Sequence, residues 1–269
     1  MHHPALALLT REVRLTLRGW TLMLVLLAVG VLLFFAAPAM LANTRAVAAG
    51  RSFLLLAANF QVVLITLISA ILIAGAVAEE RASGSTDLLL MTGMSPFSLL
   101  AGLAGGRITA LLATLAAQFP FLVMGITAGG VLPGQVIASF SVLAAHAILC
   151  TGLAVCIALE TRTHAMAVSG LLAAVFGGQM LAGFLGLSGV SAFSVLAEVF
   201  ENPAGYTFPG AWCVIHLLAG TGFFAAACLR FRSRAVAGVE RGAARPDRRG
   251  RQRQRPAAGY AFFWLDRHF

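Results

Sequence analysis

The stretch FLLLAANFQVVLITLISAILIAGAV, residues 53–77, carries no charged side chain. A helix of ~20 apolar residues crosses the hydrocarbon core of a bilayer, and it pairs every backbone N–H and C=O internally. Other apolar runs of similar length cover residues 20–41, 105–128, 135–159, 165–187 and 210–229. The sequence therefore predicts an all-α integral membrane protein with six transmembrane helices.

The overall composition is typical of an integral membrane protein. Hydrophobic residues make up 59% of the chain, charged residues 11%, and the mean hydropathy is +0.90. Soluble domains contain about 25% charged residues. Six spans in 269 residues leave no room for an ordinary catalytic domain of ~100 residues. The chain also contains no lysine, which excludes a G-x-x-x-x-G-K-[ST] phosphate loop. We expect no enzymatic activity, cofactor or metal site in this chain.

The segments on either side of the spans differ from them in charge. Residues 1–19 place apolar side chains such as Leu6, Leu9 and Val13 on one helical face and Arg11 and Arg14 largely opposite. This pattern is typical of an amphipathic helix in the membrane interface. Residues 20–231 form the predicted six-span domain. Residues 232–269 begin with a stretch rich in Arg, Gly and Ala, which predicts a basic tail that is unstructured or lies on anionic lipid.

The arginines predict the orientation of the chain. Only Arg45 and Arg51 fall on one side of the predicted bundle, whereas the other side receives Arg11, Arg14, Arg18, Arg81, Arg107, Arg162 and the tail. Lys and Arg are retained on the cytoplasmic side of membrane proteins. Both termini are therefore expected in the cytoplasm, with the chain in the cell (inner or plasma) membrane. This distribution explains the net charge of +9 without nucleic-acid binding.

Two further features lie near the last spans. Small residues recur every fourth position in the fifth predicted span, at Gly170, Ala174, Gly178, Ala182 and Gly186. Such a strip allows close helix packing, either within the chain or between subunits. The segment that follows, residues 188–209, is too short to span the membrane and too apolar for a solvated loop. We expect it to be a re-entrant segment with a short helix in the outer leaflet.

The segment between spans two and three, residues 78–98, reads AEERASGSTDLLLMTGMSPFS. Gly84 and Ser85 end the second span, Thr86 is suited to cap a new helix, and Asp87 would follow in its first turn. Apolar side chains come next on the cytoplasmic side, where they have no core to fill. Exposed apolar residues with a polar rim are typical of a protein interface.

Here the chain resembles the membrane subunit of ABC-2 type transporters. That family has an acidic-basic cluster at the end of its second span, followed by a G-T-L-E-L-L-L-T-T-P-hydrophobic-S segment and a Gly-Lys. The counterparts in this chain are Glu80-Arg81, residues 84–95 and Gly102-Leu103. The departures from the pattern are Ser85 for Thr, Thr86 for Leu, Gly93 for Pro and Leu103 for Lys. The order of entry helix, six spans and re-entrant segment extends the resemblance to residue 231.

The resemblance implies that residues 82–95 form a coupling helix that binds a separate ABC ATPase. It also implies a second permease subunit, identical or related, so that two subunits line one path. The ATPase-docking residues would be Glu79, Glu80, Arg81, Asp87, Leu88, Leu89, Leu90 and Met91.

Two other functions are compatible with parts of the sequence. A structural or assembly subunit of a membrane complex needs no more than the membrane scaffold. A rhomboid-like intramembrane serine protease would use Ser188, in the G-x-S-G pattern of residues 186–189, with His216 as its base. Ser188 lies at the outer edge of its predicted span, however, and that function leaves residues 78–106 unexplained.

Overall fold

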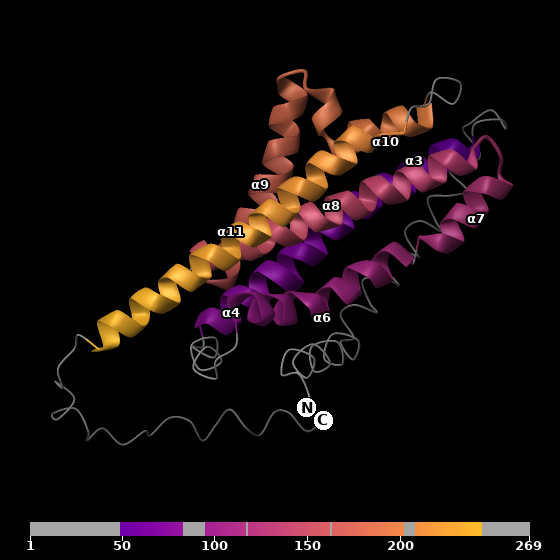
Figure 1. Ribbon diagram of the computed structural model, residues 1–269. Helices are drawn as coiled ribbons and strands as arrows, with labels where there is room; N and C mark the ends of the chain where they lie inside the picture. The colour runs from indigo at the N-terminus through magenta and orange to yellow at the C-terminus, as the bar shows by residue number, and fades with distance from the viewer. Residues whose placement is uncertain (1–48, 83–94, 117, 162, 202–207, 244–269) are drawn as a thin grey trace, which may run out of the picture. The chain divides into compact units, whose positions relative to one another are not determined.

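The computed structural model describes residues 49–82, 95–116, 118–161, 163–201 and 208–243, which are helical except for short turns and contain no strand (Figure 1). The chain divides after Arg232 into two units, and the helix bundle belongs to the first, Met1–Arg232. The helices, with η2 a π-helix and η3 a 3₁₀ turn, are α3 (Ala49–Ile68), η2 (Ser69–Gly75), α4 (Ala76–Ala82), α6 (Pro96–Ala116), α7 (Phe119–Thr127), α8 (Pro133–Glu160), α9 (His164–Phe184), η3 (Ser188–Val190), α10 (Ala192–Glu201) and α11 (Gly210–Ala243).

The described residues include five helices that are long and apolar enough to cross a membrane. They are Gly50–Glu80, Phe97–Thr127, Pro133–Glu160, His164–Phe184 and Gly210–Phe231. Five of the six predicted spans correspond to these helices, which makes this a multi-pass membrane protein. The predicted span at residues 20–41 and the predicted interfacial helix at residues 1–19 lie outside the described residues. The third span begins at Phe97 rather than at residue 105, because the preceding residues, which include Leu99 and Leu100, also belong to α6.

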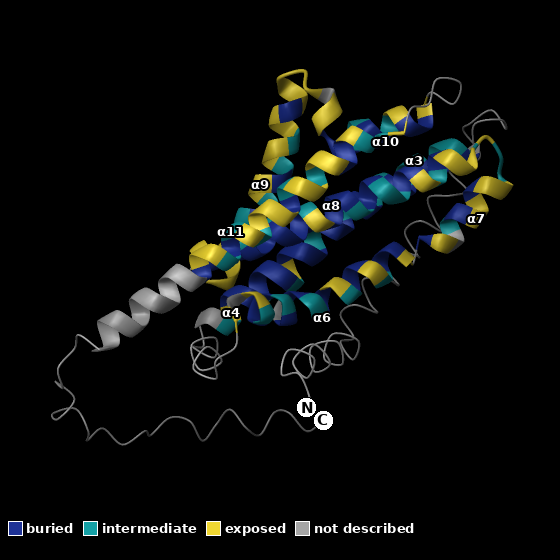
Figure 2. Ribbon diagram, viewed as in Figure 1, coloured by how far each residue is buried: buried dark blue, intermediate teal, exposed yellow. Residues whose placement is uncertain are grey.

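The second and fourth spans form the centre of the bundle. Side chains of α3, η2 and α8 are mostly buried, whereas α9 and α11 expose much of their surface (Figure 2). Leu54, Ile65, Ile73, Leu143 and Val155 are among the residues with no exposed surface in this core. Because α3 and α8 are covered by neighbours, they provide the scaffold on which the outer helices are positioned.

The third span is interrupted where the sequence predicts a kink at Pro120. Helix α6 ends at Ala116, and α7 begins at Phe119. The Gln118 N–H donates to the Leu115 carbonyl (3.1 Å), three residues back, so the Thr114 carbonyl loses its usual α-helical donor. Gln61 of α3 replaces that donor, with Nε2 2.5 Å from the Thr114 oxygen. A break within a span is tolerated when a neighbouring helix pairs the freed backbone group in this way.

The second span also departs from α-helical geometry, because η2 is a π-helical segment inside it. Gly75 of η2 lies directly against the imidazole of His164, so any Cβ at Gly75 would overlap that ring. His164 is the first residue of α9, and the Thr163 hydroxyl caps this helix by accepting from the Met166 N–H (3.3 Å). The start of α9 is therefore anchored on η2.

A short helix, α10, occupies part of the predicted re-entrant segment. Its apolar face, including Val195, Leu196 and Phe200, is buried in the bundle. Gln135, at the start of α8, holds α10 in place: Oε1 accepts from the Leu132 N–H (3.0 Å), and Nε2 donates to the Val199 carbonyl (2.7 Å). The apolar character that distinguishes this segment from a solvated loop thus serves packing against the core.

The last helix is longer than predicted. Helix α11 continues to Ala243, so residues 233–243 are helical, although the sequence predicts a tail that is unstructured or lies on anionic lipid. Ala235, Arg234 and Glu240 are good helix formers, which explains why the helix does not stop at the end of the span. The remainder of the predicted tail lies outside the described residues.

Candidate functional site

The predicted ATPase-docking segment is described at its two ends. Glu79 is exposed and Glu80 half-buried on α4, which continues the second span to Ala82. The next helix starts at Pro96, where Ser95 Oγ accepts from the Ser98 N–H (3.1 Å). The acidic pair therefore stands at the end of a span, where the sequence places it. The Arg81 side chain and all of Asp87, Leu88, Leu89, Leu90 and Met91 lie outside the described residues.

The small-residue strip does not lie on a single face of α9. Gly170 is half-buried, Ala174 and Gly178 are exposed, and Ala182 is buried. A spacing of four residues advances about 40° beyond one full turn of a helix with ~3.6 residues per turn. The strip therefore drifts by about 120° around α9 between Gly170 and Ala182, and its members do not share one environment.

Gly186, the last member of the strip, ends the helix instead of extending the strip. Its φ is +71°, in the left-handed region that glycine adopts readily. The Leu187 N–H donates to the Ala182 carbonyl (2.8 Å) and the Gly186 N–H to the Gly183 carbonyl (3.1 Å). This is the Schellman arrangement of a helix C-terminus.

The outward side of α9 is an open apolar surface. A Cβ added at Gly178 would meet no atom of the described chain within 4 Å. Further along the helix, Met180 and Phe184 expose 79% and 89% of their surface. Small residues beside large apolar ones suit either lipid or another transmembrane helix. We call the outward side of α9 around Ala174 and Gly178 the α9 face.

A polar cluster in the core is not evident from the sequence, because Thr66 is 80 residues from its partner His146 in the chain. His146 Nε2 lies 3.0 Å from the Thr66 hydroxyl oxygen and 3.4 Å from Cys150 Sγ. All three side chains are more than 90% buried. Thr66 also donates to the Val62 carbonyl (2.9 Å), so the cluster is internally hydrogen-bonded. The described residues contain no group of three or more His, Cys, Asp or Glu side chains placed to hold a metal ion. The cluster thus joins α3 to α8 as a packing element.

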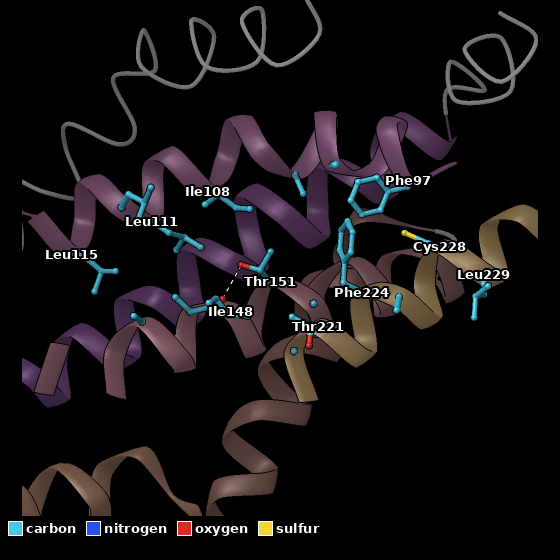
Figure 3. Close-up of a pocket in the computed structure, with 18 residues that line it drawn as sticks. Phe97, Ile108, Leu111, Leu115, Ile148, Thr151, Thr221, Phe224, Cys228 and Leu229 are labelled. Atoms are coloured by element: carbon cyan, nitrogen blue, oxygen red, sulfur yellow. Dashed lines mark hydrogen bonds between the residues drawn. The ribbon is translucent and has the colours of Figure 1, made fainter. Parts of the chain in front are cut away.

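A groove of about 830 Å³ lies between α6, α8 and α11 (Figure 3). Phe97 and Phe224 meet edge to face at one end, with ring centroids 6.0 Å apart, and Leu115 lies at the other. The lining residues are Phe97, Ala101, Ala104, Ile108, Leu111, Leu112 and Leu115 on α6, Ala144, Ala147, Ile148, Thr151 and Gly152 on α8, and Gly220, Thr221, Phe224, Ala225, Cys228 and Leu229 on α11. This volume is within the ~300–1,000 Å³ of ligand sites, but it offers a ligand almost only apolar contacts.

The groove depends on a very close crossing of α8 and α11. A Cβ at Gly152 would overlap the Gly220 carbonyl, and a Cβ at Gly220 would come within 2.6 Å of the Ile148 carbonyl oxygen. Glycine is needed at both positions because it lets two helix backbones touch. At one end of this contact, Arg230 of α11 pairs with Glu160 of α8 (Nη1 to Oε1, 3.3 Å).

His216, the expected base of the alternative protease, makes its described contacts with Trp212. The two rings stack with centroids 3.6 Å apart, and Nδ1 lies 3.0 Å from the Trp212 carbonyl oxygen. Trp212 in turn donates from Nε1 to the Val190 carbonyl (3.1 Å). These contacts explain His216 as part of the packing between α11 and η3, and the Ser188 side chain lies outside the described residues.

Neither the comparison with protein-family models nor that with curated proteins finds a match for this chain.

Proposed function

We propose that this chain is the permease subunit of an ABC-2 type transporter and that a separate ATPase subunit powers it. The observation that carries the proposal is the segment between Ala82 and Ser95. It follows the acidic pair Glu79-Glu80 at the end of a span, it contains the ABC-2-like pattern, and α6 starts directly after it. The short helix α10 before the last span adds support, because the family has a re-entrant segment at that place.

The distribution of ionisable groups favours a transporter that is powered by ATP hydrolysis in a partner protein rather than by ions crossing its own spans. Within the described spans, the charged or histidine side chains away from the helix ends are Arg107, His146 and His216. His146 and His216 are both engaged in packing contacts. Ion-coupled carriers and pumps use chains of ionisable residues inside their spans. A chain with so few of them is better suited to a conduit in which ATP hydrolysis by a partner drives the change of shape.

The proposal is tested by purification of the full-length chain from its native membrane, with mass-spectrometric identification of the proteins that accompany it. We expect an ABC ATPase in about equal amount. As a control, an unrelated multi-pass protein with the same affinity tag, from the same membrane, should not retain that ATPase. Recovery of other membrane subunits without any ATPase would contradict the transporter proposal and favour an assembly subunit.

A second prediction concerns the subunit interface, which we propose at the α9 face. Replacing Gly178 by Leu adds a side chain where the described chain leaves open space, so the subunit itself should keep its stability. A partner helix packed against Gly178 would be pushed away. We expect Gly178→Leu to convert a dimer into monomers in mild detergent, as measured by light scattering, without lowering the thermal unfolding midpoint.

Ala182→Leu is the matched comparison on the same helix. Ala182 is 6% exposed, so the larger side chain must displace neighbours within the subunit, which typically costs about 1–3 kcal/mol. We expect this variant to lower the unfolding midpoint. A dimer that survives Gly178→Leu unchanged would show that the α9 face contacts lipid rather than a second permease subunit.

A further inference from the structure

The groove between α6, α8 and α11 has the dimensions and the residue spacing of a helix-binding groove. All the residues of its α6 wall except Leu112 follow spacings of four and three residues in alternation: Phe97, Ala101, Ala104, Ile108, Leu111 and Leu115. This is the spacing by which one helix lines the seam with another. At ~1.5 Å per residue the wall is roughly 27 Å long, close to the ~30 Å hydrocarbon core of a bilayer.

The polar groups of the lining do not point to a polar occupant. The hydroxyl of Thr151 donates to the Ala147 carbonyl (2.8 Å), and that of Thr221 donates to the Leu217 carbonyl (2.8 Å). Both hydroxyl hydrogens are therefore used within their own helices. The lining includes the short side chains of Ala101, Ala104 and Ala144, which leave room for large side chains of a facing helix.

Residues 20–41 of this chain have the matching pattern. They form the predicted span that lies outside the described residues, and Trp20, Leu24, Leu27, Val31 and Phe34 recur in them with the same four-three spacing. The stripe offers large side chains, such as those of Leu24 and Leu27, that suit the small Ala101 and Ala104 of the groove. In length, 22 residues at ~1.5 Å each correspond to about 33 Å, which covers the α6 wall.

The connection between residues 20–41 and the described chain places this segment near the groove. Only residues 42–48 precede α3, and they reach at most about 25 Å at ~3.6 Å per residue. The start of α3 lies beside the end of α7, because a Cβ at Gly50 would overlap the carbonyl oxygens of Gly125 and Gly129. Helix α7 continues the span whose α6 part forms the groove wall. The predicted span is thus tethered to the end of the helix pair that it would cover.

We propose that residues 20–41 of the same chain fill this groove, with the stripe from Trp20 to Phe34 packed between α6, α8 and α11. The groove then belongs to the fold of the subunit and is not a substrate cavity. The α9 face is left as the open apolar surface for a partner. This inference does not depend on an ATPase, so its test and that of the transporter proposal can fail separately.

The test uses the native thiol of Cys228, which lines the end of the groove near Phe97. Residues 20–41 would be antiparallel to α3, so Trp20 should lie at the same end of the bundle as Phe97 and Cys228. Leu24→Cys, on the stripe, is compared with Leu26→Cys, which is at nearly the same depth but about 160° away around the helix. Leu27→Cys provides a second stripe position if Leu24→Cys lowers the yield. Full-length variants are oxidised in native membranes, and disulfide-linked peptides are identified separately in the monomer and dimer bands.

In the monomer band, we expect the yield of the disulfide to Cys228 to be at least about tenfold higher for Leu24→Cys or Leu27→Cys than for Leu26→Cys. The reason is that a disulfide requires the two Cα atoms to lie within ~7 Å of each other. The same disulfide found only in the dimer band would overturn the proposal and assign the groove to a second copy. No disulfide from either stripe position, or equal amounts from both faces, would also overturn it and leave lipid as the occupant.

Discussion

Leu89→Asp should release the ATPase from the membrane subunit while the subunit remains folded. In the proposed transporter Leu89 belongs to the coupling helix, and its side chain is an anchor in a cleft of the ATPase. Truncating such an anchor costs about 1–4 kcal/mol, and burying a carboxylate in its place costs more. Since ~1.4 kcal/mol corresponds to a tenfold change in Kd, we expect affinity to fall by at least about tenfold. Pull-down of the ATPase and thermal unfolding in detergent measure the two effects separately.

Leu132→Asp is the matched control for this variant. Leu132 is 49% exposed in the turn before α8, at the opposite end of the third span from the coupling segment. It is the N-cap residue of α8, a position that favours Asp, so the same substitution should not destabilise the subunit. ATPase binding should be unchanged. If Leu89→Asp retained the ATPase as well as Leu132→Asp does, residues 82–95 would not be the docking helix.

Gly152→Ala should strongly destabilise the bundle, although it adds only one methyl group. The added Cβ would overlap the Gly220 carbonyl, which is part of a helix backbone and cannot rotate away. Helices α8 and α11 must then separate, and the loss of their packing is expected to cost about 3 kcal/mol or more, at the upper end of overpacking. The unfolding midpoint in detergent should fall clearly, even though alanine favours helix over glycine.

The control for this prediction is Gly222→Ala, two residues after Gly220 on the same helix. A Cβ at Gly222 would meet no described atom within 4 Å. It gains the same helix propensity, up to about 1 kcal/mol, without the overlap, so its unfolding midpoint should stay the same or rise. Equal behaviour of the two alanine variants would show that α8 and α11 do not cross at Gly152 and Gly220.

The five described spans and the break before Pro120 are predictable from the sequence because both depend on local chemistry. A run such as residues 53–77 enters lipid through its own apolar side chains, whatever surrounds it. Pro120 lacks the N–H of an α-helical hydrogen bond wherever it stands. The helix extension past Arg232 agrees with the helix propensity of residues such as Ala235, whereas the basic charge of the tail indicates only that it is solvated.

The candidate surfaces, in contrast, depend on how the helices are rotated against each other. The spacing of Gly170 to Gly186 indicates a strip on one face, but only the packed bundle determines that Gly178 is exposed, Ala182 is buried and Gly186 caps the helix. Thr66 and His146 are 80 residues apart and meet because α3 packs on α8. The groove likewise needs three helices at once.

The physical reason for this division is the solvent. Insertion into lipid is driven by the hydrophobicity of each span separately, so it is encoded within ~20 consecutive residues. Between inserted helices there is no comparable hydrophobic force, and association depends on van der Waals contact and a few interhelical hydrogen bonds. Those contacts, such as Gly152 on Gly220 or Gln61 on the Thr114 carbonyl, join residues from distant parts of the chain. Composition therefore determined that the chain crosses the membrane, and only the tertiary packing decided which faces remain open for partners.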